Sequence, residues 1–103
     1  MKQFAIIGIG RFSRRMLEEL ADAGCEILLI DKDREVVDLY KDKVAATFIA
    51  DVISEEVINK LVPASVDAAI VDLGDNLEAS ILATNYLKKL GVGRIITKAE
   101  SEQ

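Results

Sequence analysis

Residues 4–13 read FAIIGIGRFS, and this stretch decides the fold. The apolar residues at its start are typical of a buried strand, and the residues after Gly10 have the periodicity of a helix. Two glycines, Gly8 and Gly10, join the two segments. The stretch therefore predicts a strand that passes through a tight turn straight into a helix.

The rest of the chain repeats this alternation of short apolar runs and longer amphipathic segments. Strands are predicted at residues 3–7, 26–30, 46–50, 67–71 and 94–97, and helices at 11–23, about 34–41, 55–61 and 76–90. Strands that are apolar throughout are typical of a parallel sheet covered on both faces. The predicted fold class is α/β, a Rossmann-like parallel sheet of about five strands with helices on both faces. The sixth strand of a full sheet of this type is lacking, supplied by a partner, or truncated.

The composition limits the functions open to the chain. Its 103 residues are expected to form one domain, spanning 1–103. The net charge of −5 argues against binding to nucleic acid or to an anionic membrane. With no histidine and one cysteine, Cys25, the chain offers neither an internal disulfide nor a zinc site. No apolar run reaches about 18 residues and no signal peptide is visible, so we expect a cytoplasmic protein without direct membrane insertion.

The glycine turn has the pattern of a dinucleotide-binding loop, Gly-x-Gly-x-x-Gly between a strand and a helix. Gly8 allows the tight turn, and Gly10 lets a pyrophosphate approach the backbone. The start of the helix offers free N–H groups and a positive dipole end to the anion. Arg11 adds a forked donor, and Ser13 occupies the third glycine position, where a small residue lets the helix pack close to the strand. A plain turn without a ligand is the alternative.

Asp31 follows the second predicted strand, about 20 residues after the glycine turn, where an acid accepts hydrogen bonds from the ribose hydroxyls of adenosine. Its charge would repel a 2′-phosphate, so NADP is disfavoured. The alternative is that Asp31 only caps the next helix, although Asp33 is better placed for that task.

Two further loops are expected to line the same edge of the sheet, because ligands in open α/β sheets bind outside the carboxyl ends of the strands. After the third strand, Asp51 is either a contact for the adenine amino group or a solvated residue before a helix. Val52 is placed to pack on the adenine ring. After the fourth strand, Gly74 permits close approach to the backbone.

The acidic residues of this fourth loop also have structural interpretations. Asp75 is predicted to begin the last helix, since Asp75 and Glu78 have the spacing of a capping box, which is favoured over a metal site. Asp72 stands at the end of an apolar strand, and if it is buried it needs a partner. Arg11 and Lys98 are the candidate partners.

Five stretches carry a resemblance to a known family and together cover nearly the whole chain. They are residues 4–12 (FAIIGIGRF), 29–33 (LIDKD), 49–52 (IADV), 70–80 (IVDLGDNLEAS) and 96–99 (ITKA). They resemble the N-terminal lobe of the RCK domains, also called KTN or TrkA-N domains. These domains are the cytoplasmic gating subunits of potassium channels and of Trk/Ktr potassium uptake systems.

The resemblance implies a regulatory domain that binds ATP/ADP or NAD(H) and is not an enzyme. Exchange of the ligand would change the angle between paired domains and pass that motion to a membrane potassium channel or transporter subunit. The chain would be a homo-oligomer, a dimer or higher, held at the inner face of the membrane through that partner.

The resemblance also implies roles for individual residues. Arg11 and Lys98 would contact phosphates, Asp31 would hold the ribose, and Asp51 and Val52 would frame the adenine. The loop at Gly74 and Asn76 would close over the phosphates or the second nucleoside. The full predicted site is Gly8, Ile9, Gly10, Arg11, Phe12, Asp31, Lys32, Asp51, Val52, Leu73, Gly74, Asn76 and Lys98.

Some features depart from the family pattern. Ser13 replaces the third glycine, and Asp72 stands where members usually have a small or apolar residue. The sixth strand, the crossover helix and the C-terminal lobe of the family are expected to be missing, so the family's assembly is not assumed.

Two other classes of protein are alternatives to the regulatory domain. One is the cofactor-binding fragment of an NAD-dependent oxidoreductase, which usually needs a proton donor. The chain has no histidine, and Tyr40 and Tyr86 lie in helical patterns that explain them as packing residues. The other is a response-regulator-like domain with Asp51 as phosphate acceptor, which requires an acidic pocket where this chain has its glycine turn.

Overall fold

The strands form one parallel sheet in the order β3-β2-β1-β4-β5, which confirms the predicted fold class. The structure is a computed structural model that describes residues 1–52 and 54–98. The strands are β1 (Gln3–Ile7), β2 (Glu26–Asp31), β3 (Ala46–Ile49), β4 (Ala68–Asp72) and β5 (Ile95–Lys98). The prediction about a sixth strand concerns the chain beyond residue 98, outside the described residues.

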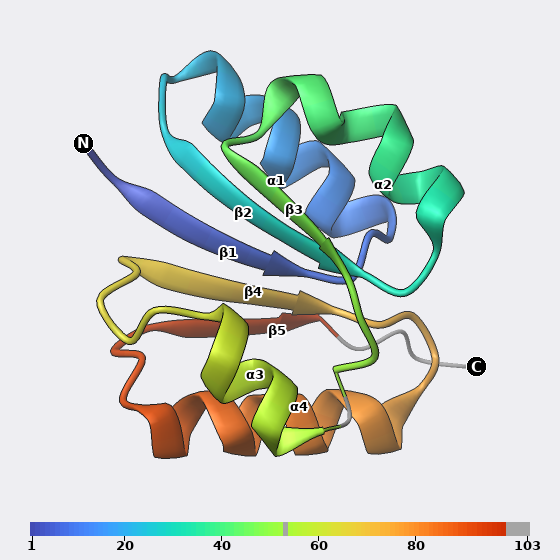
Figure 1. Cartoon of the computed structure of the whole chain (residues 1–103), viewed down its shortest axis with the longest axis vertical. Helices are drawn as coiled ribbons and strands as arrows, with labels where there is room; N and C mark the ends of the chain where they lie inside the picture. The colour runs from blue at the N-terminus through green and yellow to red at the C-terminus, as the bar shows by residue number, and fades with distance from the viewer. Residues whose placement is uncertain (53, 99–103) are drawn as a thin grey trace.

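The helices cover both faces of the sheet, as predicted. They are α1 (Arg11–Asp22), α2 (Arg34–Tyr40), α3 (Glu55–Leu61) and α4 (Leu77–Leu90), with a short 3-10 turn at Lys41–Lys43. Figure 1 shows α1 and α2 on one face and α3 and α4 on the other. Within the described ranges, no helix combines the length and the apolar character that a membrane crossing requires.

Alternation along the central strands divides the core between the two faces. Ile6 and Ile70 pack with Leu17 of α1, whereas their neighbours Ile7 and Val71 pack in a second cluster with residues of α3 and α4. Strand β4 is buried along its whole length, because it lies inside the sheet between β1 and β5. The central strands are therefore buried on both faces, which explains why they read as continuous apolar runs, whereas the edge strands β3 and β5 are partly exposed.

The strand order places an edge of the sheet where the chain changes direction. From β1 the chain builds outward through β2 to β3, then returns across the sheet to β4 on the other side of β1. Neighbouring strands in such a sheet diverge at this switch point, and their carboxyl ends leave a crevice. The register sets Ile7 beside both Ile30 and Val71, so β1, β2 and β4 end at a common level.

The predicted start of α4 is wrong by one residue. Asn76 is the N-cap, with its Oδ1 accepting a hydrogen bond of 3.1 Å from the amide of Ala79. The preceding turn is closed by a bond from the Asn76 amide to the Leu73 carbonyl, which leaves Asp75 inside the turn. Either residue suits an N-cap by type, and the turn decides between them. Asp33, in contrast, caps α2 as expected, accepting from the amide of Glu35.

Truncation of Leu87 tests the core on the α3 and α4 face. Leu87 is 0% exposed and packs with Ile58 and Val71, so Leu87→Ala is expected to lower the free energy of unfolding by about 2–5 kcal/mol. Urea denaturation followed by circular dichroism measures this change. Leu39, which is 75% exposed, is the control, and Leu39→Ala is expected to stay within about 0.5 kcal/mol of the parent. Equal losses for the two variants would contradict the described core.

Candidate functional site

A cavity of about 520 Å³ lies at the carboxyl-end edge of the sheet. This volume is within the range of about 300–1,000 Å³ that is typical of small-molecule sites. Its walls come from the ends of β1, β2, β3 and β4 and from the start of α4. The lining residues are Gly8, Ile9, Gly10, Ile30, Asp31, Lys32, Ala50, Asp51, Val52, Asp72, Leu73, Gly74, Asp75, Asn76 and Ala79.

The two glycines of the first loop are required by steric crowding against the end of β4. Gly8 has a φ of +87°, and a Cβ at this position would overlap the Asp72 carbonyl and the Leu73 side chain. At Gly10 a Cβ would stand 2.6 Å from both carboxylate oxygens of Asp72. Real Cβ contacts are not this short, so another residue type would require the backbone to shift at Gly8, and either the loop or the Asp72 side chain to shift at Gly10.

Ser13 has a larger role than the sequence suggested. It is fully buried, and its hydroxyl accepts a hydrogen bond of 2.9 Å from the Gly10 amide and donates one of 2.7 Å to the Gly8 carbonyl. Ser13 is therefore more than a small packing residue, because its hydroxyl ties the two glycines to the first turn of α1. A glycine in its place would leave both backbone groups without these partners.

Asp31 holds the same loop from the side of β2. Its Oδ2 accepts from the amide of Ile9 at 2.8 Å, and its Oδ1 accepts from the amide of Asp33 at 2.9 Å. The carboxylate lines the cavity and is half-buried. Each carboxylate oxygen can accept more than one hydrogen bond, so both remain able to accept from a ligand.

Asp72 is the buried acid of the site. It is 2% exposed, and its Oδ2 accepts a hydrogen bond of 2.9 Å from the amide of Ser13. The prediction that Arg11 or Lys98 would neutralise it is not met. Lys98 lies opposite Asp72 in the β4–β5 register, but neither of the two ion pairs found among the described residues includes Asp72. A backbone amide at the positive end of α1 takes the place of a cationic side chain.

These contacts leave a defined set of donors at the start of α1. The amides of Ile9, Gly10 and Ser13 are engaged by Asp31, the Ser13 hydroxyl and Asp72. Arg11 and Phe12 occupy the first two positions of α1. Amides at these positions have no carbonyl acceptor within the helix. An anion at this helix terminus would therefore meet these two amides first.

The cavity brings together ten of the thirteen residues predicted from the sequence. The other three, Arg11, Phe12 and Lys98, are not part of its lining. Arg11 and Lys98 are exposed, whereas Phe12 is half-buried and packs on the α1 face of the core. Val52 lines the cavity but also belongs to the core on the opposite face, where it is 6% exposed.

Sequence reasoning missed five residues of the lining. They are Ile30, Ala50, Asp72, Asp75 and Ala79. Ile30 and Ala50 directly precede two predicted site residues, so their position next to Asp31 and Asp51 was the available signal. The acid at position 72 is unusual at the end of an apolar strand, but only the fold shows that it faces the glycine loop.

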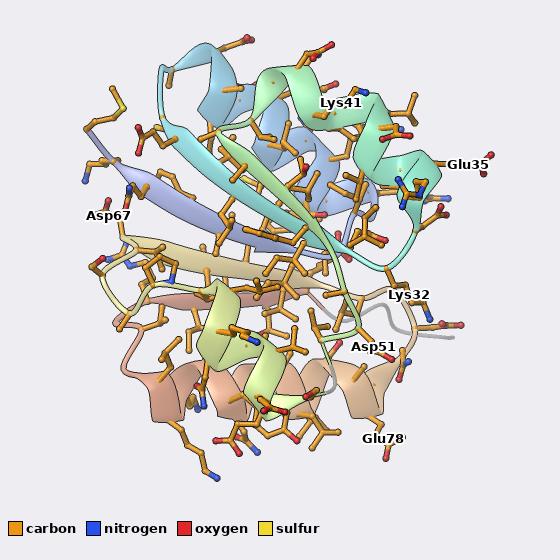
Figure 2. The ribbon with its side chains drawn as sticks, viewed as in Figure 1. Lys32, Glu35, Lys41, Asp51, Asp67 and Glu78 are labelled. Atoms are coloured by element: carbon orange, nitrogen blue, oxygen red, sulfur yellow. The ribbon has the colours of Figure 1, made fainter. Side chains whose placement is uncertain are left out.

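Acidic side chains dominate the electrostatics of the lining. Asp31, Asp51, Asp72 and Asp75 contribute to it, and Lys32 is the cation among the lining residues. Figure 2 shows Lys32 and Asp51 at the same edge of the sheet. No group of three or more potential ligands for a metal ion is found in the described part of the chain. The arrangement offers acceptors for sugar hydroxyls and amides for an anion.

Comparison with known sequences places this site in a family context. Residues 4–103 match the family model of the TrkA-N domain. The chain is 38% identical over 101 residues to the Ktr system potassium uptake protein C of Bacillus subtilis (strain 168), covering 98% of this chain and 46% of the relative. The chain therefore spans about half the length of this curated relative.

Solved structures share the fold. The NAD(P)-binding domain of an exopolyphosphatase-related protein from Archaeoglobus fulgidus aligns with a TM-score of 0.80 and 24% identity, over 98% of this chain and 75% of that chain. The GsuK channel bound to NAD aligns with a TM-score of 0.79 and 14% identity, over 97% of this chain and 18% of that chain. At these identities the likeness shows the fold alone.

A double-mutant cycle between Gly10 and Asp72 tests the geometry of the loop. Gly10 has a φ of −125°, which alanine also adopts, so Gly10→Ala adds only the overlap with the Asp72 carboxylate. We expect it to lower the free energy of unfolding by about 1–3 kcal/mol. In an Asp72→Ala background the overlap is gone, and the cost of Gly10→Ala is expected to fall by at least about 1 kcal/mol.

Chemical denaturation of the four proteins measures the coupling. Gly93→Ala is the matched control, because nothing lies within 4 Å of a Cβ at that glycine. A cost for Gly10→Ala that is the same in both backgrounds would contradict the described contact.

Proposed function

Since the chain belongs to the TrkA-N domain family, we propose that it is the nucleotide-binding regulatory part of a potassium uptake system. The ligand is an adenine nucleotide, either ATP/ADP or NAD(H). The partner is a membrane potassium channel or transporter subunit, whose activity follows the state of assembly of this domain. The proposal gives the chain a binding role without a catalytic step.

One observation carries the proposal, namely the cavity at the switch point with the glycine turn on one side and Asp31 on its rim. A diphosphate at the start of α1 would meet the Arg11 and Phe12 amides and the positive end of the helix dipole. The adjoining ribose would then lie toward β2, where Asp31 can accept from its hydroxyls. The glycines and the acid have already been held in this arrangement by protein hydrogen bonds, so little ordering is needed on binding.

The remaining walls suit the other parts of the ligand. Asp51 and Val52 follow β3, next to Asp31, and are proposed to frame the adenine. Gly74 and Asn76 also line the cavity, and the loop there is proposed to close over the phosphates or a second nucleoside. The Oδ1 of Asn76 is used by the α4 cap, so its side-chain amide is the group left for a ligand.

The start of α4 supports a link from ligand to assembly. Leu77 and Ile81, one turn apart on α4, are 60% and 52% exposed, and Ile96 on the edge strand β5 is also exposed. Large apolar side chains left in water beside a ligand site are typical of an interaction surface. We propose that this surface contacts a further copy of the domain, in a homo-oligomer attached to the cytoplasmic side of the membrane by its partner. A ligand can shift such an assembly only by binding one state more tightly than another.

Replacement of Asp31 tests the sugar end of the site. Asp31→Asn removes the charge and one acceptor, so calorimetric titration is expected to show about tenfold weaker binding of ADP and NAD. The parent is expected to bind NAD more tightly than NADP because the carboxylate repels the 2′-phosphate, and Asp31→Asn should narrow that difference. Asp33→Asn is the control, since an asparagine side chain still suits the cap of α2 and Asp33 is outside the cavity. Unchanged affinities in Asp31→Asn would count against the proposed ribose contact.

Replacement of Arg11 tests the phosphate end. Arg11 is exposed at the first position of α1, where its guanidinium can reach a terminal phosphate beyond the cavity lining. Arg11→Ala is expected to weaken ATP about tenfold, ADP less, and AMP least. Arg15→Ala, one turn further along α1, removes the same charge away from the loop and is expected to change the three affinities little. Equal losses for ATP, ADP and AMP in Arg11→Ala would contradict this role.

A further inference from the structure

The carboxylate of Asp72 is hydrogen-bonded within the first turn of α1, whereas that of Asp31 is bonded to the loop before the helix, at Ile9. The Oδ2 of Asp72 accepts from the amide of Ser13 in the first turn of α1, at 2.9 Å. Both carboxylate oxygens of Asp72 stand 2.6 Å from the position of a Cβ at Gly10. A phosphate bound at the next two amides, those of Arg11 and Phe12, would therefore have this carboxylate as a near neighbour.

Burial makes this charge different from the other acids of the lining. Asp72 is 2% exposed, whereas Asp75 is exposed and Asp31 is half-buried. Water and salt screen an exposed carboxylate strongly and a buried one weakly. Lys98 is the register neighbour of Asp72, but its side chain is exposed and makes no described ion pair with it. The repulsion felt by an anion at the start of α1 therefore comes mainly from Asp72.

We propose that Asp72 determines specificity by charge, making this a site for a diphosphate esterified at both ends, as in a dinucleotide, in preference to a nucleoside triphosphate. The inference rests on the proposed function and concerns the same cavity. An internal diphosphate carries fewer negative charges than a terminal triphosphate, while both present oxygens to the Arg11 and Phe12 amides. Each additional negative charge on a ligand near a poorly screened carboxylate weakens the binding of that ligand by roughly tenfold.

Asp72 already places a negative charge at the positive end of α1, as a bound anion would. The start of α1 has a limited positive field, and a carboxylate hydrogen-bonded to the third amide of the helix uses some of it. The loop is therefore stable without a ligand, and the remaining field favours an anion of low charge. A small or apolar residue at position 72 would leave the full field to the ligand.

Asp72→Asn is the direct test, because Asn keeps an oxygen to accept from the Ser13 amide while removing the charge. Affinities for NAD, NADH, ADP and ATP are measured by calorimetry in magnesium-free buffer. We expect the parent to bind NAD and NADH at least about tenfold more tightly than ATP, and Asp72→Asn to reduce that ratio by about tenfold. Asp72→Ala, which leaves room beside Gly10, is the second variant. The same affinities are measured for Asp72→Ala if Asp72→Asn does not fold.

Asp75→Asn is the matched control, since Asp75 lines the same cavity and carries the same charge but is exposed. It is expected to change the ratio by less than about twofold. A parent that binds ATP more tightly than NAD, a ratio that neither Asp72 variant changes, or an equal change in Asp75→Asn would each overturn the inference while leaving nucleotide binding intact. Binding of no nucleotide by the parent and the variants would overturn the proposed function and this inference together.

Discussion

The fold of this chain depends on the close contact between the glycine loop and the end of β4. A side chain at Gly8 would overlap the Asp72 carbonyl and Leu73, and a side chain at Gly10 would overlap the Asp72 carboxylate. This contact brings β1, α1 and β4 together at the point where the sheet reverses its direction of growth. It fixes where α1 begins, and so it fixes which backbone amides face the cavity. The start of α1 and the shape of the cavity are thus linked through one steric constraint.

Hydrogen bonds to acidic and hydroxyl side chains make the loop rigid before any ligand binds. Asp31 holds Ile9, Ser13 holds Gly10 and Gly8, and Asp72 holds Ser13. In water-filled loops such amides would be satisfied by solvent, and a ligand would have to displace it. Here the same groups that shape the site also reduce the number of free amides. The loop is preorganised, and the proposed cost is a weaker attraction for highly charged anions.

The sequence predicted the sheet, the helices and most of the cavity because these depend on local patterns. Apolar runs and helical periodicity located the elements to within one or two residues, and the rule that ligands bind at carboxyl ends of strands located the loops. The predictions were wrong where two neighbouring residues suited the same role equally well, or where a contact between distant parts of the chain determines the partner. Asp75 and Asn76 are both suitable caps, and only the turn from Leu73 selects Asn76. The partner of Asp72 is an amide 59 residues away in the chain, which no local spacing reveals.

The two walls of the cavity differ in how they are held, and this difference bears on the proposed regulation. The glycine wall is bonded to β2 through Asp31 and to β4 through Asp72. The turn at 74–76 has its own described bonds, from Asn76 to Leu73 and from Leu77 to Asp75, together with the α4 cap, and Leu73 before it packs against the glycine loop at Gly8. A Cβ at Gly74 would have no atom within 4 Å, so the space into which a side chain at this position would point is open. The proposed ligand, bridging the glycine loop and this turn, is therefore expected to displace the turn more readily than the loop. Because this turn leads directly into α4 and its exposed Leu77 and Ile81, the proposed signal would leave the site through α4 rather than through α1.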